Sequence, residues 1–368
     1  MATPTIELAI LDDYQNVAFA HFEKTHPRQL QITCIPSTLP PFSHPSTTAA
    51  QKAELIARLR PFQIISTMRE RTPFPRELLA ELPNLRLLLT TGPYNAAIDM
   101  AAAKELGIAV CGTTGGGRSD RPAPAAPSNG TDSTTQHAWA LILGLARHIA
   151  RDDAVVKAGG WQTDLAVGLV GKTLGLVGLG RLGPAVGRIG VLAFGMKVAA
   201  WSSSLTQAGA DEKARAAGLP VTDPSTGEKT FRAVSKAALF ETADVVSVHY
   251  TLSPRSAGIV GAAELGAMKK SALLVNTSRG PVVDEAALLA ALQDGAIRGA
   301  ALDVFELEPL PPHSAWRTTP WGQHGRSEVV LSPHMGYVEE ATVHAWYDET
   351  AENVERWIDG RELRSRIN

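Results

Sequence analysis

Three glycines, Gly178, Gly180 and Gly183, give this sequence its clearest chemical signal. The apolar run 173–177 precedes them and a helix-like stretch follows. In such a G-x-G-x-x-G turn the first glycine permits a tight turn, the second lets a pyrophosphate approach the backbone, and the third lets helix and strand pack closely. The helix N-terminus offers N–H groups and partial positive charge to phosphates. A chance glycine-rich turn is the alternative, but the flanking strand and helix favour dinucleotide binding.

The residues inside and after this turn bear on which dinucleotide would bind. Arg181, next to Leu182, would add a charge-assisted phosphate contact or else point to solvent. The next predicted strand runs into Ser202 and Ser203, where an acidic residue often grips the adenosine ribose. Serines remove the repulsion toward a 2′-phosphate, yet no arginine stands within a few residues to hold one. The sequence therefore leaves both NAD and NADP open.

Short apolar runs alternate with helix-like stretches over most of the chain, which predicts parallel sheets joined by crossover helices. In the first half the predicted strands are 6–11, 31–35, 63–67, 85–90 and 108–111. In the second half they are 173–177, 197–201, 244–249, 273–276, 299–304 and 329–332. The fold class is therefore α/β, and the open sheets would bind ligands beyond the carboxyl ends of their strands.

The segments between and after the strands complete this prediction. Residues 113–133 are rich in Gly, Pro and Ser and are expected to form a mobile linker. A long helix is expected over 135–158, and a shorter one over 284–294, with Asp284 as N-cap. The stretch 339–359 places apolar residues on one helical face, and we expect this helix to return to the first unit.

Composition excludes several classes of protein. The 368 residues include 35 Lys and Arg against 37 Asp and Glu, so the net charge of −2 argues against a nucleic-acid partner. No apolar run is long enough for a membrane span, and we expect no membrane partner. Two cysteines, Cys34 and Cys111, fit a reducing, cytoplasmic setting. The histidines show no ligand-like clustering, so no metal is expected.

Three further motifs, in order after the glycine turn, carry a family resemblance. They are Asn-Thr-Ser-Arg-Gly-Pro-Val-Val-Asp-Glu at 276–285, Leu-Asp-Val-Phe-Glu-Leu-Glu-Pro-Leu-Pro at 302–311, and Ser-Pro-His-Met-Gly at 332–336. With them the chain resembles the D-2-hydroxyacid dehydrogenases, which include phosphoglycerate dehydrogenase, D-lactate dehydrogenase and the glyoxylate/hydroxypyruvate reductases. The resemblance covers nearly the whole chain except 113–133 and a stretch near 222–232.

The resemblance implies a catalytic triad. His334 would protonate the substrate carbonyl oxygen while hydride arrives from the nicotinamide, and Glu308 would bond to the imidazole and favour its protonated form. Arg279 would hold the substrate carboxylate and polarise the carbonyl. The residue types suit these roles, because histidine gives and takes protons near neutral pH and the planar arginine fork fits a carboxylate.

The resemblance also implies cofactor and substrate contacts. Besides the glycine turn and the two serines, the cofactor residues would be His249, Tyr250, Thr251, Thr277, Ser278, Asp303 and Gly336. Asp303 would contact the nicotinamide carboxamide. The substrate residues would be Arg69, Gly92, Tyr94 and Asn95, in loops of the first unit. Pro93 departs from an amide-lined carboxylate cradle because it has no N–H, so the size of the substrate stays open.

Each assignment has a structural alternative. Arg279 would merely cap a strand end, Glu308 would be a surface charge in a turn, and His334 would be a satisfied core histidine. Arg69, beside Glu70, would belong to a solvated charge cluster. The functional alternative is a dinucleotide-sensing module like the related transcriptional co-repressors, which bind cofactor without physiological turnover.

The predicted architecture is two doubly wound, Rossmann-like domains with an interdomain cleft. A flavodoxin-like substrate domain would span 1–133 and be completed by the C-terminal helix within 336–368. A dinucleotide domain would span 134–335 and bind NAD or NADP. The resemblance implies a homodimer acting on a small 2-oxo or 2-hydroxy acid.

Overall fold

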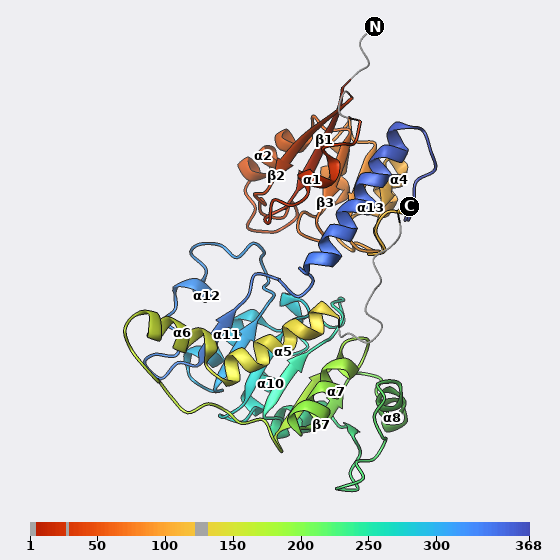
Figure 1. Cartoon of the computed structure of the whole chain (residues 1–368). Coiled ribbons are helices and arrows are strands. Elements are labelled where there is room, and N and C mark those ends of the chain that lie inside the picture. Colours follow the sequence, from red (N-terminus) through yellow and green to blue (C-terminus); the bar gives the residue numbers. More distant parts are fainter. Residues whose placement is uncertain (1–4, 27–28, 122–131) are drawn as a thin grey trace. The chain divides into compact units, whose positions relative to one another are not determined.

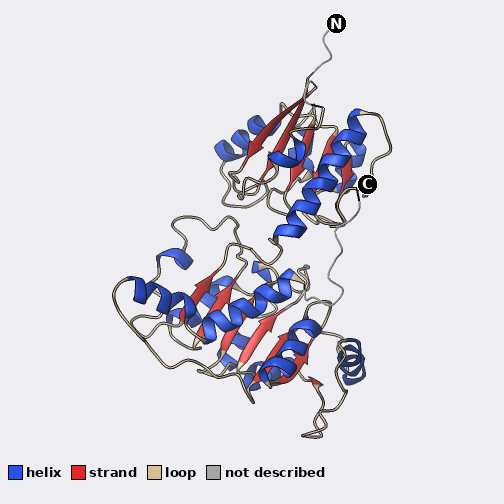
Figure 2. Cartoon of the chain, viewed as in Figure 1, coloured by secondary structure: helices blue, strands red, loops and turns tan. Residues whose placement is uncertain are grey.

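A computed structural model describes residues 5–26, 29–121 and 132–368. The chain divides into two compact units (Figure 1). The first comprises Met1–Ser128 with Glu339–Asn368, and the second comprises Asn129–Val338. In each unit the strands lie between helices (Figure 2), as buried parallel sheets require.

The first unit is built on a five-stranded parallel sheet of order β2-β1-β3-β4-β5. Its strands are β1 (Ile6–Leu11), β2 (Leu30–Ile35), β3 (Ile64–Thr67), β4 (Leu87–Thr90) and β5 (Ala109–Cys111). This confirms the predicted strands, and the order is that of flavodoxin-like sheets. The strand order reverses between β1 and β3, so the loops after those strands flank the place where such sheets bind ligands.

Helices from both ends of the chain cover this sheet. They are α1 (Phe19–Phe22), α2 (Ala49–Leu59), α3 (Arg76–Ala80), α4 (Met100–Glu105) and α13 (Glu340–Ile358). The C-terminal helix α13 packs against α1 and β4 (Figure 1). Its inner face includes the buried side chains of Val343, Trp346 and Tyr347.

Three glutamates on α13 hold the start of the Gly/Pro-rich segment that we expected to be mobile. Glu349 is 5% exposed and accepts backbone N–H groups from Thr114 (2.6 Å), Gly115 (2.7 Å) and Gly117 (3.0 Å). Two further glutamates on the same helix bind Arg118 and Ser119, the next two residues of the segment. Residues 114–119 are therefore anchored to α13, contrary to the expectation of a mobile linker there, and residues 122–131 lie outside the described part of the chain.

The second unit contains a seven-stranded parallel sheet of order β12-β11-β10-β9-β6-β7-β8. The strands are β6 (Thr173–Val177), β7 (Lys197–Trp201), β8 (Phe231–Ala233), β9 (Val245–Val248), β10 (Leu273–Asn276), β11 (Gly299–Leu302) and β12 (Glu328–Leu331). The order reverses between β6 and β9, which is the Rossmann arrangement and confirms the doubly wound prediction for this unit. The edge strand β8 was not predicted, because three residues carry too little periodicity.

The helices of this unit are α5 (Ser133–Ala146), α6 (Ile149–Lys157), α7 (Gly183–Phe194), α8 (Gln207–Ala216), α9 (Lys236–Thr242), α10 (Ala262–Ala267), α11 (Glu285–Gln293) and α12 (Ala315–Thr318), with a short 3₁₀ turn at Gly280–Val282. The helix expected over 135–158 is wrong, because it breaks at His148 into α5 and α6. His148 adopts a left-handed φ of +57°, and its buried Nδ1 lies 2.5 Å from Glu328 Oε2. Helix α11 is confirmed, since Asp284 caps it by accepting the Ala287 N–H at 3.0 Å.

Within the described residues, every helix is too short or too polar to cross a lipid bilayer.

Candidate active site

The three predicted catalytic side chains follow three neighbouring strands of the second sheet. Arg279 comes after β10, Glu308 after β11 and His334 after β12, and these strands are adjacent in the order β12-β11-β10. Because the strands are parallel, all three loops emerge at the same edge of the sheet. The topology therefore brings together residues that are separated by up to 55 positions in the chain.

A short contact in this group joins His334 and Glu308. His334 Nδ1 lies 2.6 Å from Glu308 Oε2, and the two side chains are 15% and 19% exposed. The other carboxylate oxygen, Oε1, accepts the backbone N–H of Phe305 at 2.9 Å. The carboxylate is thus fixed from its own loop and orients the imidazole through Nδ1.

Gly280 lies where the loop after β10, which carries Arg279, packs against the loop after β11, which carries Glu308. A Cβ on Gly280 would lie 2.0 Å from the carbonyl carbon and oxygen of Phe305, so only glycine permits this close approach. Arg279, directly before it, donates from Nη1 to the carbonyl of Ser278 at 2.8 Å. Asn276 at the end of β10 accepts the N–H and hydroxyl of Ser278, which fixes the turn.

Asp303 organises the histidine loop. The residue is 1% exposed, and its carboxylate accepts the N–H groups of Met335 (2.7 Å) and Gly336 (2.9 Å) and the Ser332 hydroxyl (2.7 Å). Burial alone would raise the pKa of Asp303, but hydrogen bonds from His137 and Ser332 outweigh burial and lower it. Asp303 therefore holds the backbone just after His334 and the Ser332 side chain before it, and the predicted contact with nicotinamide stays a prediction.

His137 is a member of this group that the sequence did not predict. It lies on α5, and its Nε2 is 3.0 Å from Asp303 Oδ1 and 2.9 Å from the Ser332 hydroxyl. A lone histidine on a largely apolar helix carries no motif, so only the packing of α5 against β10, β11 and β12 reveals it.

The glycine turn has the geometry that a pyrophosphate requires. Gly178 has φ +102°, and a Cβ there would lie 2.7 Å from the carbonyl oxygen of His249. A Cβ on Gly183 would lie 2.3 Å from the Gly178 oxygen, whereas one on Gly180 would meet no described atom within 4 Å. The outer glycines are therefore needed for the fold, and the middle one leaves open space over the backbone. Helix α7 begins there after Leu182, whose side chain makes no cap hydrogen bond to it.

Two buried polar atoms at the carboxyl edge of the same sheet also fit a bound ligand. His249 Nδ1 and Thr277 Oγ1 have no hydrogen-bond partner among the described residues, although each follows a strand at the ligand-binding edge. Burial lowers the pKa of His249 to about 4, so its imidazole is neutral at neutral pH. Together with the glycine turn, these atoms fit a dinucleotide along the carboxyl edge of the sheet.

The residues after β7 form a polar corner without a carboxylate. Ser203 donates its N–H to the Tyr250 hydroxyl at 3.2 Å, and their hydroxyls lie 2.9 Å apart. The rings of Tyr250 and Trp201 stack with centroids 6.0 Å apart, while Ser202 extends the same turn. Thr251, on the following loop, is exposed and accepts the Ser256 hydroxyl at its carbonyl. This corner is where the adenosine end of a dinucleotide would lie.

Arg181 is 76% exposed, and its Nη1 lies 3.9 Å from Asp132 Oδ2 in a long ion pair. The phosphate contact predicted for Arg181 stays a prediction.

The predicted substrate residues of the first unit cluster after β3 and β4. Arg69 has a strained left-handed φ of +51°, and its guanidinium lies over Gly92, where a Cβ would be 1.9 Å from Nη1. Asn95 is fully buried and donates to the Arg69 carbonyl at 2.7 Å, so it positions the arginine. Tyr94 is 63% exposed, and the Gly92 N–H already donates to Thr113 at 2.6 Å. The Gly92 N–H is therefore already used, and Pro93 has no N–H. Neither residue offers the backbone donor that the expected carboxylate cradle requires.

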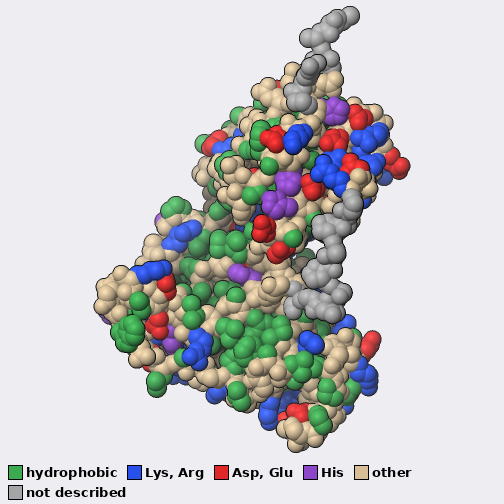
Figure 3. All heavy atoms as spheres, in the orientation of Figure 1, with side chains coloured by type: hydrophobic (Ala, Val, Ile, Leu, Met, Phe, Trp, Pro, Cys, Tyr) green, Lys and Arg blue, Asp and Glu red, His purple; other side chains and the backbone are tan. Residues whose placement is uncertain are grey.

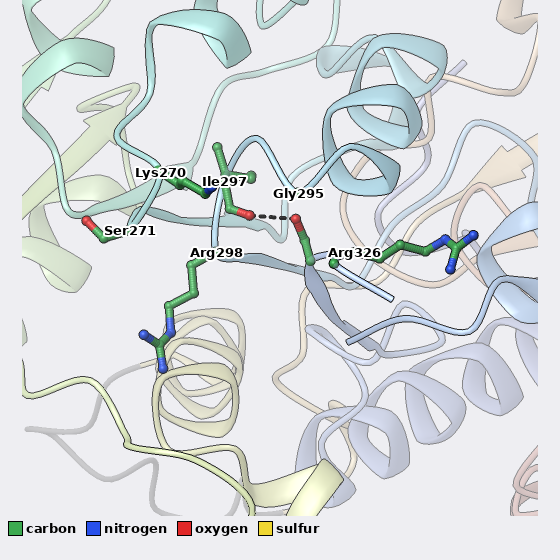
Figure 4. Close-up of a pocket in the computed structure, with 8 residues that line it drawn as sticks. Lys270, Ser271, Gly295, Ile297, Arg298 and Arg326 are labelled. Carbon is green, nitrogen blue, oxygen red and sulfur yellow. Dashed lines mark hydrogen bonds between the residues drawn. The ribbon is translucent and has the colours of Figure 1, made fainter. Parts of the chain in front are cut away.

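A separate hollow of about 400 Å³ lies at the amino ends of β10, β11 and β12, away from these loops. Figure 4 shows Arg298 and Arg326 extending in different directions from it. Arg298 donates to the Leu165 carbonyl at 2.6 Å. The hollow therefore gathers no set of groups that converge on a ligand. Among the described residues no group of three or more His, Cys, Asp or Glu side chains could hold a metal ion.

Comparison with known proteins decides the family. Residues 139–336 match the family described as D-isomer specific 2-hydroxyacid dehydrogenase, NAD binding domain. The chain is 33% identical to a glyoxylate reductase of Aeropyrum pernix over 79% of each chain. The chain belongs to the D-isomer specific 2-hydroxyacid dehydrogenases.

Other members of the family agree with this assignment. A hydroxypyruvate reductase of Blautia hydrogenotrophica is 29% identical over 85% of this chain and 88% of its own. The crystal structure of a phosphoglycerate oxidoreductase from Vibrio cholerae O395 superposes with a TM-score of 0.76 at 32% identity, covering 97% of this chain and 100% of that one. As a 2-hydroxyacid dehydrogenase, the protein is an oxidoreductase that acts on 2-hydroxy acids with NAD or NADP.

Proposed function

We propose that this dehydrogenase reduces a small 2-oxo acid to the D-2-hydroxy acid, with His334 as the proton donor. The observation that carries the proposal is the 2.6 Å contact between His334 Nδ1 and a Glu308 carboxylate that Phe305 fixes from its backbone. When bound, the dinucleotide supplies hydride to the carbonyl carbon. His334 would give its Nε2 proton to the carbonyl oxygen, and Glu308 would stabilise the imidazolium before the transfer.

On this proposal Arg279 binds the substrate carboxylate through its guanidinium and draws electron density from the carbonyl oxygen. Arg69 would contribute a second cationic contact to the substrate. The names of the relatives in Aeropyrum pernix and Blautia hydrogenotrophica favour glyoxylate and hydroxypyruvate as first substrates.

We also propose a cytoplasmic homodimer. Several large hydrophobic side chains of the second unit are exposed on α6, on the segment after it and on α7. They are Ile149, Val156, Trp161, Leu165, Val170 and Leu192. Figure 3 shows hydrophobic side chains gathered on the face of this unit that carries α5, the helix that α6 and α7 flank. Exposed apolar surface of this kind supports self-association.

The test is oxidation of NADH and NADPH with glyoxylate, hydroxypyruvate and pyruvate, measured for the wild-type protein and for His334→Ala. Loss of the proton donor is expected to lower kcat about 10²–10⁴-fold, while dinucleotide binding measured by calorimetry stays within twofold. His313→Ala, which removes an exposed histidine of the same unit, is the matched control. Near-normal turnover of His334→Ala with every oxo acid would refute the proton-donor role, and binding without any turnover in the wild type would favour a sensing module.

A further inference from the structure

An aromatic ring packs against the proposed proton donor. The rings of Tyr337 and His334 meet edge to face, with centroids 5.5 Å apart and planes inclined at 76°. This is a preferred arrangement for aromatic pairs, in which the positive edge of one ring approaches the negative face of the other. Tyr337 is the residue directly after the histidine motif, 332–336. The motif itself does not predict an aromatic side chain at this position.

The backbone of the histidine loop fixes where the Tyr337 ring can lie. The Val338 N–H donates to the Met335 carbonyl at 2.9 Å, which closes a turn around Tyr337. The two residues before Tyr337 donate their N–H groups to the buried Asp303 carboxylate. A Cβ on Gly336 would come within 3.1 Å of Asp303 Oδ2 and 3.4 Å of Thr134 Cγ2, so the turn is held tightly against α5. These backbone contacts therefore fix the position from which the Tyr337 ring packs against His334.

Two contacts of different kinds meet the imidazole. Glu308 holds it at Nδ1, and Tyr337 packs against the ring itself. His334 has a left-handed φ of +56°, so its side chain leaves the backbone in an uncommon direction. A contact on the ring restrains the plane of the imidazole, whereas the hydrogen bond at Nδ1 restrains the position of that atom.

We propose that Tyr337 is a positioning residue that sets the plane of the His334 imidazole, so that Nε2 points at the substrate carbonyl. The inference rests on the proposed function, because it assigns His334 the proton transfer. The flat ring of Tyr337 makes the contact, and its hydroxyl is not required for it. A misaligned donor slows proton transfer without changing how substrate or dinucleotide binds, since orientation matters most in the transition state.

The test compares Tyr337→Phe, which keeps the ring, with Tyr337→Leu, which keeps apolar bulk without a flat ring. Tyr337→Phe is expected to retain kcat within twofold. Tyr337→Leu is expected to lose about tenfold in kcat with KM within twofold, and its solvent deuterium isotope effect on kcat should rise as proton transfer becomes slower. Thermal unfolding is measured for both variants, and Phe19→Ala, which removes an exposed ring of the first unit, is the control.

The outcomes separate this inference from the proposed function. Wild-type kcat in Tyr337→Leu together with an inactive His334→Ala would overturn the positioning role and leave the proton donor in place. An equal loss in Tyr337→Phe and Tyr337→Leu would overturn it too, because the hydroxyl would then be the active feature. An active His334→Ala would refute the proposed function itself, whatever the Tyr337 variants show.

Discussion

The pair of His334 and Glu308 carries the proposed chemistry at the scale of single residues. Both carboxylate oxygens of Glu308 are used, one by the imidazole and one by the Phe305 N–H. An amide in its place would keep most of the shape but would no longer offset the positive charge of a protonated ring. The charge of Glu308, in addition to its position, is therefore what the proposal requires.

We predict that Glu308→Gln lowers kcat for oxo-acid reduction about 10–100-fold, because the imidazolium loses its counter-charge. Steady-state kinetics with a saturating oxo acid measure the loss. Glu306→Gln, two residues earlier in the same loop and exposed, is the control. A wild-type kcat in Glu308→Gln would contradict the electrostatic role.

At this scale the sequence predicted site residues only where they lie inside recognisable motifs. Arg279, Glu308 and His334 were predicted from the family resemblance, and the structure brings their loops to one sheet edge. His137 and Tyr337 were not predicted. His137 reaches Asp303 and Ser332 from a helix far away in the sequence, and the histidine motif gives no signal for the ring contact between Tyr337 and His334.

At the scale of elements, the three glycines in the turn between β6 and α7 have different surroundings. Gly178 and Gly183 are held by backbone atoms of their own unit, whereas the space above Gly180 is open. The outer glycines are therefore needed for the fold, whereas we propose that the middle glycine is needed for binding. Spacing alone predicted the turn, but only the coordinates separate the two tasks.

We predict that Gly180→Ala folds normally but binds NAD or NADP at least tenfold more weakly, because its methyl group would occupy the space that a pyrophosphate needs. Gly183→Ala should instead destabilise the second unit by about 1–3 kcal/mol, since its Cβ would be forced against a carbonyl oxygen. Calorimetric titration and thermal unfolding distinguish the two variants. Gly144→Ala, in α5 with open space around it, is the control. Wild-type affinity in Gly180→Ala would show that the turn does not approach the cofactor.

Two other elements depend on contacts with distant parts of the chain, which local sequence patterns do not reveal. The break between α5 and α6 depends on His148, whose left-handed backbone is stabilised by Glu328 from a distant strand. The ordered start of the Gly/Pro-rich segment depends on glutamates more than 200 residues later in the chain. In both cases tertiary partners override what the nearby composition favours.

At the scale of the whole molecule, hydrogen bonds and ion pairs of a buried glutamate connect the C-terminal helix α13 to the rest of the first unit. Glu352 is 2% exposed and accepts the Ser119 N–H at 2.7 Å, while Arg356 and Arg364 lie 2.9 and 2.8 Å from its two oxygens. Burial alone would raise the pKa of Glu352, but these hydrogen bonds lower it from 4.5 to about 2. The folded state therefore favours the ionised carboxylate.

We predict that this preference makes the first unit sensitive to acid. A lowered pKa stabilises the fold above the unfolded value of 4.5, and this contribution, about 3 kcal/mol, is lost as the pH falls toward 2. Glu352→Gln should remove it at neutral pH and flatten the dependence of unfolding free energy on pH between these values. Urea unfolding at a series of pH values measures the change, with the exposed Glu362→Gln as control. An identical pH dependence in Glu352→Gln and wild type would contradict the prediction.

Arg279, Glu308 and His334 all belong to the second unit, on loops that leave three consecutive strands. The residues of the proposed chemistry therefore come from one continuous segment of the polypeptide. A hybrid that joins this segment to the flanking segments of a relative would carry the contact between His334 and Glu308 across intact, because every strand and loop that builds it travels with the segment.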